Sequence, residues 1–138
     1  MKLLIVEDEA LTRDSLVQVI SRSPLKDRYD ELLTACDGSE GLEMALAHRP
    51  EIILTDVRMP SLRGDQMAME IRKRLPNVCI IFMSGYSDKE YLLSAVKVNA
   101  DNYLEKPLDI AELLATLEAA TTRQQRRARE TQYTTQNQ

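Results

Sequence analysis

The stretch Leu3-Leu4-Ile5-Val6-Glu7-Asp8 joins a continuous apolar run to two acids that follow it directly. A run without the apolar–polar alternation of a half-exposed strand is typical of a strand buried on both faces, as in a parallel sheet. Four further short runs follow along the chain, at residues 32–36, 52–54, 78–83 and 102–104. The sequence therefore predicts five strands, the first beginning near Leu3.

Segments with helical spacing of apolar residues separate these runs. This spacing predicts helices over residues 10–22, 39–48, 65–75 and 88–98. A last helix is expected to begin at Asp109, because Glu112 follows three residues later in a capping-box pattern. Strands that alternate with helices predict a doubly wound α/β fold with a five-stranded parallel sheet and five helices.

Length and composition restrict the class of protein. A chain of 138 residues fits one domain of ordinary size. Its net charge of -4 disfavours a surface built broadly for nucleic acid or anionic membrane. No apolar run reaches the roughly 20 residues that span a bilayer, and the first residues do not form a signal peptide. We therefore expect a cytoplasmic protein, with Cys36 and Cys79 as two reduced core thiols.

The composition changes near Ala120. Residues 1–120 are expected to form the domain, and residues 121–138 a polar tail or the start of a linker to an output domain not present in this chain. The last helix is expected to run to about Glu130, with residues 131–138 disordered or in a linker. The segment carries four arginines, which we interpret as a solvated helix face rather than a nucleic-acid site: Arg123, Arg126, Arg127 and Arg129.

Reactive polar side chains follow four of the five predicted strands. Glu7 and Asp8 come after the first strand, Asp56 after the third, Ser84 after the fourth and Lys106 after the fifth. In an open α/β sheet, ligands bind outside the carboxyl ends of the strands. These side chains are therefore expected to meet at one edge of the sheet.

The residue types at this edge indicate phosphoryl chemistry. Glu7, Asp8 and Asp56 would repel one another unless a hard cation lay among them, and such oxygen ligands suit Mg²⁺. Lys106 adds a positive charge and Ser84 a hydroxyl donor, which together with a metal would neutralise a transferred phosphoryl group. The carboxylate of Asp56 can act as the nucleophile and form an acyl phosphate.

Other phosphate-binding sites fit less well. The chain lacks both the GxxxxGK[ST] pattern of a P-loop and the GxGxxG pattern of a dinucleotide site. The loop Glu7-Asp8-Glu9 would repel a flavin phosphate in the absence of a metal. It also has the wrong order for the DxD motif of haloacid-dehalogenase-type phosphatases.

Residues 1–120 resemble the response-regulator receiver domains of two-component signal transduction systems. The resemblance is carried, in order, by residues 3–9, by Asp56-Val57-Arg58-Met59-Pro60 with Gly64, by Met83-Ser84-Gly85-Tyr86 and by Tyr103-Leu104-Glu105-Lys106-Pro107. It implies a flavodoxin-like fold with strand order 2-1-3-4-5.

The resemblance also implies a role for each site residue. Asp56 would be the phosphoacceptor. Mg²⁺ would be held directly by Asp8, through water by Glu7, and by the backbone carbonyl of Arg58. Lys106 would pair with the phosphoryl oxygens, and its bond to Pro107 is expected to be cis. Arg58 and Tyr86 flank the site, where they would tune the lifetime of the phosphoryl group.

A switch and its partners are implied in the same way. Ser84 would move toward the new phosphoryl oxygens, and Tyr103 would turn inward. This change would alter the face formed by the fourth helix, fifth strand and fifth helix, through which the protein could form a homodimer. The phosphoryl donor would be a sensor histidine kinase or a phosphotransfer protein.

The sequence is compatible with four functions. The first is a phosphoacceptor switch that is not a turnover enzyme, as the input half of a transcription factor that contacts DNA only through its output domain. The second is a stand-alone receiver that acts by docking or phosphorelay. A Mg²⁺-dependent phosphatase that uses Asp56 covalently is a third, but it lacks an acid–base carboxylate beside the nucleophile. A degenerate receiver that only binds partners is the fourth.

Overall fold

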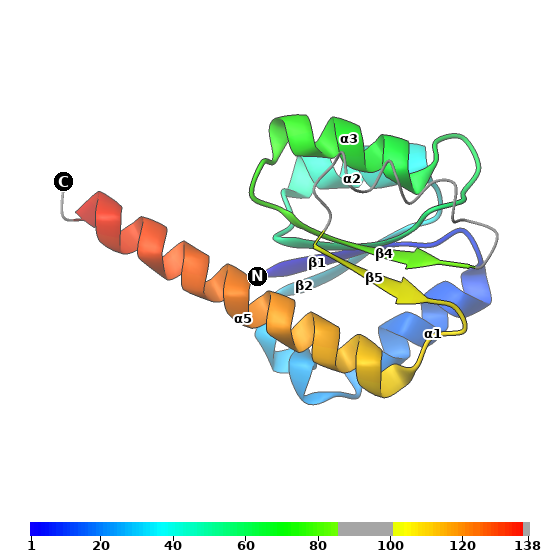
Figure 1. Ribbon diagram of the computed structural model, residues 1–138, viewed down its shortest axis with the longest axis horizontal. Coiled ribbons are helices and arrows are strands. Elements are labelled where there is room, and N and C mark those ends of the chain that lie inside the picture. The colour runs from blue at the N-terminus through cyan, green and yellow to red at the C-terminus, as the bar shows by residue number, and fades with distance from the viewer. Residues whose placement is uncertain (86–100, 137–138) are drawn as a thin grey trace.

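The fold is a parallel sheet covered by helices on both faces (Figure 1). A computed structural model describes residues 1–85 and 101–136, with side chains as far as Thr131. Its five strands are β1 (Lys2–Val6), β2 (Glu31–Ala35), β3 (Ile52–Asp56), β4 (Cys79–Ser84) and β5 (Asn102–Glu105). All pair in parallel in the order β2-β1-β3-β4-β5. The predicted fold class and strand order are confirmed.

The helices are α1 (Ala10–Ser21), α2 (Gly38–His48), α3 (Gly64–Arg74) and α5 (Ile110–Gln136), each close to a predicted helix. The helix predicted over residues 88–98 lies outside the described residues, as does Tyr86. A short 3₁₀ helix, η1 (Pro24–Arg28), was not predicted. It begins where the Ser23 hydroxyl accepts a hydrogen bond from the backbone N–H of Leu25.

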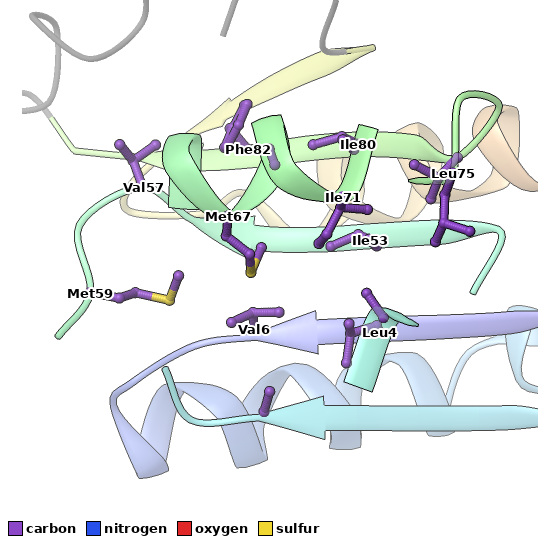
Figure 2. Packing of buried hydrophobic residues seen from close by; sticks show 14 residues of the cluster. Leu4, Val6, Ile53, Val57, Met59, Met67, Ile71, Leu75, Ile80 and Phe82 are labelled. Carbon is purple, nitrogen blue, oxygen red and sulfur yellow. The ribbon is translucent and has the colours of Figure 1, made fainter. Parts of the chain in front are cut away.

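Apolar side chains alternate between the two faces of the sheet, and both faces are buried because helices cover them. On one face, Leu4, Ile53 and Phe82 pack with α2 and α3. Figure 2 shows Met67 and Ile71 of α3 projecting toward this face. On the other face, Leu3, Ile5, Leu54 and Ile81 form a second cluster with side chains from α1 and α5. Rigid strands packed on both sides fix the positions of the residues at their carboxyl ends.

Two expectations are corrected by the structure. Cys36 is exposed rather than part of the core, because it follows the end of β2, which is an edge strand of the sheet. Only Cys79 is buried, and both thiols are free. Helix α5 runs to Gln136, past the expected end near Glu130. Among the described residues, no helix is both long enough and apolar enough to cross a membrane.

Candidate functional site

The site lies at the carboxyl edge of the sheet, where β1, β3, β4 and β5 end. Asp56 and Ser84 are the last residues of β3 and β4. Both were expected to follow their strands, and each instead forms the final residue of its strand. Glu7 directly follows β1, and Lys106 directly follows β5. Because β3 pairs with β1 on one side and with β4 on the other, the strand order brings these residues together.

Asp56 is held at both of its carboxylate oxygens. Oδ1 accepts a hydrogen bond from the backbone N–H of Val57 at 2.8 Å, and Oδ2 accepts one from Lys106 Nζ at 2.7 Å. The residue is only 5% exposed. These contacts fix the orientation of the carboxylate while one edge of it stays next to a positive charge.

Lys106 bridges two acids. Its Nζ also lies 3.4 Å from Glu7 Oε1, and its backbone N–H donates to the carbonyl of Ser84 at 2.9 Å, which ties the end of β5 to the end of β4. Burial alone would lower the pKa of Lys106, but the hydrogen bond and charge of Asp56 outweigh it and raise the pKa. Lys106 therefore stays protonated. The Lys106–Pro107 bond is cis, as expected.

Glu7 is a buried acid beside another acid. Its side chain is fully buried, and Oε2 accepts a hydrogen bond from the backbone N–H of Asp8 at 3.0 Å. Burial raises the pKa of Glu7 to about 8, with a further contribution from Asp56 and an opposing one from Lys106. Burial therefore favours the protonated form of Glu7 when no second cation is in the site.

The three predicted acids converge. Glu7, Asp8 and Asp56 each offer a carboxylate oxygen, and these oxygens all lie within 4.8 Å of one another. Asp8 is exposed, whereas the other two are buried. The three oxygens are ligands that suit a hard divalent cation such as Mg²⁺. Because Asp8 is exposed, a cation bound here could keep several of its waters.

The loop from β3 to α3 closes tightly over the backbone of Asp56. The N–H of Gly64 donates to the carbonyl of Val57 at 2.7 Å. A Cβ atom at position 64 would lie 1.9 Å from the carbonyl oxygen of Asp56. Only glycine allows this approach, so Gly64 is required for the path of the loop that follows the central acid.

The comparisons with known proteins agree with this geometry. A family model described as "Response regulator receiver domain" matches residues 3–118. The chain belongs to the response regulator receiver domain family. A two component transcriptional regulator AraC from Clostridium phytofermentans superposes with a TM-score of 0.78 at 40% identity, over 93% of this chain and 98% of that chain. The receiver (REC) domain of AraT, a response regulator from Geobacillus stearothermophilus, gives 0.81 at 29% identity, over 92% and 97%.

This receiver is also similar to longer regulators. The transcriptional regulatory protein HptR of Staphylococcus aureus is 35% identical over 113 residues. The match covers 81% of this chain but 43% of HptR. The receiver thus spans less than half the length of the curated relatives it matches.

The two residues expected to act as the switch of the receiver lie on adjacent strands. Ser84 is 4% exposed at the end of β4. Tyr103 on β5 is 37% exposed, and its ring stacks on Phe82 with the centroids 6.4 Å apart. These positions describe one conformation of the two side chains. The switch role of both residues therefore stays a prediction. The same holds for the carbonyl of Arg58, an exposed residue in the loop after β3.

Sequence reasoning missed one residue of this receiver site. Arg13 of α1 donates from Nη1 to the backbone carbonyl of Glu7 at 2.8 Å, which ties the start of α1 to the acidic loop. Its only signal in the sequence is an arginine one helical turn after Glu9, a spacing shared by many surface arginines. The contact depends on how the loop between β1 and α1 folds back, which the pattern of apolar residues does not encode.

Proposed function

We propose that this receiver is a phosphoacceptor switch in which Asp56 takes a phosphoryl group in a Mg²⁺-dependent reaction. The observation that carries the proposal is the convergence of two other acids and a lysine on the carboxylate of Asp56. Asp56 has Lys106 Nζ at 2.7 Å and shares a cluster of carboxylate oxygens with Glu7 and Asp8. A metal on one side and an ammonium on the other would neutralise the charge of a phosphoryl group on Asp56.

The reaction needs no other residue as nucleophile. A carboxylate oxygen of Asp56 attacks phosphorus, and a P–O bond forms while the P–N bond of a phosphohistidine donor breaks. The imidazole leaves with the bonding electron pair, and a proton then restores its neutral form. The product is an acyl phosphate. Mg²⁺, when bound, would supply a Lewis acid that offsets the negative charge of the entering group.

The residues around Asp56 prepare it for this step. The N–H of Val57 holds the first oxygen of the carboxylate, and Lys106 stays charged at the second. The ammonium of Lys106 can move from Asp56 Oδ2 to a phosphoryl oxygen, because a flexible side chain carries it. Asp8, as the exposed acid, is the proposed direct metal ligand, and Glu7 the proposed ligand through water. The Arg58 carbonyl would complete the ligand set.

The donor is proposed to be a histidine kinase or a phosphotransfer protein. An apolar groove between α1 and the start of α5 reaches Lys106, and its lining includes Leu11 and Ile110. These two side chains are 84% and 54% exposed. A donor that presents its phosphohistidine to Asp56 must lie close to Lys106, so the groove is a suitable contact surface for an apolar face of the donor.

The output is proposed to be control of transcription, with DNA bound by an output domain outside this chain. The similarity to HptR, named a transcriptional regulatory protein, supports this proposal. A stand-alone receiver in the cytoplasm that acts by docking remains the alternative. Slow loss of the phosphoryl group, rather than turnover of a substrate, is proposed as the resetting step. A homodimer through β5, α5 and the fourth helix is part of the same proposal.

Intact-mass spectrometry tests the proposal. The protein is incubated with acetyl phosphate in excess Mg²⁺, in EDTA, and as the variants Asp56→Asn and Asp14→Asn. We expect one phosphoryl group on the wild type and on Asp14→Asn, whose exposed acid lies on α1. We expect none in EDTA or on Asp56→Asn. Equal labelling of Asp56→Asn would remove Asp56 from the role, and sustained turnover of a phosphate ester beyond one equivalent would favour a phosphatase.

A further inference from the structure

Helix α5 is packed into the domain beyond the expected boundary at Ala120. Thr121 is fully buried and Gln124 is 6% exposed. Gln124 Nε2 donates to two backbone carbonyls, that of Glu51 at 2.7 Å and that of Asn77 at 2.9 Å. These carbonyls lie just before β3 and β4, at the edge of the sheet opposite to Asp56. A single amide group thus joins α5 to the starts of two central strands.

Neighbouring side chains of α5 extend this contact on both sides. Arg127 donates to the same Asn77 carbonyl at 3.0 Å, and Arg123 lies 3.4 Å from Asp101 Oδ1. On the other side, the hydroxyls of Thr121 and Tyr29 are 2.7 Å apart. We call the four α5 residues that make these contacts the clamp: Thr121, Arg123, Gln124 and Arg127.

The helix continues well past the clamp. Figure 1 shows the last turns of α5 extending away from the sheet, beyond the N-terminus of the chain. We call residues 128–136 the arm. The arm holds only Ala128 and Tyr133 as apolar residues, so it lacks the apolar stripe that packs a helix onto another surface. Short helices without packing are marginal in water, because starting the first turn is costly. The arm is helical because it extends a helix that is already anchored.

We propose that the clamp fixes the direction of the arm, and that Gln124 is its positioning residue. Every clamp contact is polar and directional, so it sets the rotation of α5 about its axis as well as its position. The apolar contacts of α5, which include Leu113, Leu117 and Ala120, tolerate small rotations. Arg28 of η1 adds polar contacts to Thr122 and Gln125 on another side of the helix. Whatever the arm meets is thereby presented at a fixed angle to the receiver. The proposal does not depend on phosphorylation of Asp56.

The clamp also accounts for part of the basic segment. All four arginines are exposed, but Arg123 and Arg127 donate hydrogen bonds to the receiver itself. Two of the four arginines therefore lie on the side of α5 that faces the domain. This favours the interpretation of the cluster as a structural helix face over a nucleic-acid site.

Amide hydrogen exchange measured by mass spectrometry tests the clamp. Gln124→Met keeps the shape of the side chain and removes both hydrogen bonds. Its matched control is Arg126→Met, an exposed position in the same turn. Two lost hydrogen bonds, each worth about 1 kcal/mol, predict exchange of the arm amides that is faster by roughly tenfold or more in Gln124→Met. We expect unchanged exchange in Arg126→Met and in β1 and β3 of both variants.

Two results would overturn the proposal. One is arm exchange in Gln124→Met equal to that of the wild type, and the other is an equal loss of protection in Arg126→Met. Loss of protection from exchange in β1 and β3 of Gln124→Met as well would indicate a disturbed core. Arg127→Met is then the deciding variant, because this exposed side chain can be changed without disturbing the core. Faster exchange in the arm alone would then support the clamp, and unchanged exchange would overturn it.

Discussion

Lys106 Nζ lies 2.7 Å from Asp56 Oδ2 and bridges to Glu7, although Lys106 and Asp56 are 50 residues apart in the chain. The lysine lies on the Oδ2 side of the Asp56 carboxylate, where it could also contact an oxygen of a phosphoryl group on Asp56. Its two partners are acids that are themselves buried. The ammonium therefore serves the resting site as a counter-charge and is already in place for a more highly charged product.

Loss of this ammonium is predicted to slow phosphorylation. In Lys106→Met, the developing charge on the phosphoryl group loses one of its two partners. Removal of one preorganised donor of this kind costs roughly a hundredfold or more in rate. The time course of labelling by acetyl phosphate, quenched and read by intact mass, measures it. Lys73→Met, at an exposed side chain on α3, is the control. A rate in Lys106→Met close to that of the wild type would contradict the role given to Lys106.

The buried acid Glu7 predicts a pH-dependent stability in the metal-free protein. Its pKa is about 8 when folded and 4.5 as a free group, so the folded state keeps a proton that the unfolded state loses. The contribution of Glu7 to stability is therefore full below pH 4.5, falls as the pH rises above that value, and is lost by about pH 8.

Glu7→Gln removes this titration and keeps the shape of the side chain. Urea unfolding in EDTA should show Glu7→Gln gaining stability relative to the wild type as the pH rises through the same window. Glu9→Gln, at an exposed acid of the same loop, should follow the wild type. If the difference between Glu7→Gln and the wild type did not change with pH, Glu7 would not be protonated in the folded site. Excess Mg²⁺ is expected to reduce the difference, because it favours the charged carboxylate.

Gly64→Ala is predicted to destabilise the protein and displace the loop beside Asp56. The added Cβ meets the backbone oxygen of Asp56 at 1.9 Å, and neither atom can move without shifting the backbone. We expect a loss of about 1–3 kcal/mol in the free energy of unfolding, as for other overpacked sites. In Gly41→Ala the nearest atom is Met67 Sδ at 2.6 Å, a side-chain atom rather than a backbone atom, so the loss should be smaller. The reverse order in urea unfolding would contradict this account of the loop.

The two thiols are predicted to differ in reactivity. Cys36 is exposed, whereas Cys79 is buried and burial raises its pKa to about 11. Because the thiolate is the reactive form, a maleimide should label one thiol in the native protein and both in urea. Peptide mapping should place the native label on Cys36. Rapid native labelling of Cys79 would show that the start of β4 opens readily to solvent.

Much of the fold and site could be predicted because strands and acids are local signals. The run from Leu3 to Val6, followed by two acids, defines both a buried strand and the start of the site. The strand order came from the family resemblance, since apolar patterning does not specify which strands pair. The pattern also could not show that Cys36 is exposed, because its apolar neighbours belong to an edge strand.

The boundary at Ala120 shows a different limit of sequence reasoning. The segment that follows is polar, and polar segments usually form tails. Here Gln124 and Thr121 are buried because backbone carbonyls and a tyrosine hydroxyl satisfy them. Such pairing depends on groups brought together by the fold. Arg13 was missed for the same reason, since its partner is the backbone carbonyl of Glu7.

Chemical trapping of the acyl phosphate tests the central claim most directly. Borohydride reduces an aspartyl phosphate to homoserine and leaves free carboxylates unchanged, so the modified residue can be read from peptide masses. After incubation with acetyl phosphate and Mg²⁺, we predict homoserine at position 56, and unmodified Glu7, Asp8 and Asp65. Homoserine at another position, or none despite a confirmed phosphoryl group on the intact protein, would contradict the assignment of Asp56 as the phosphoacceptor.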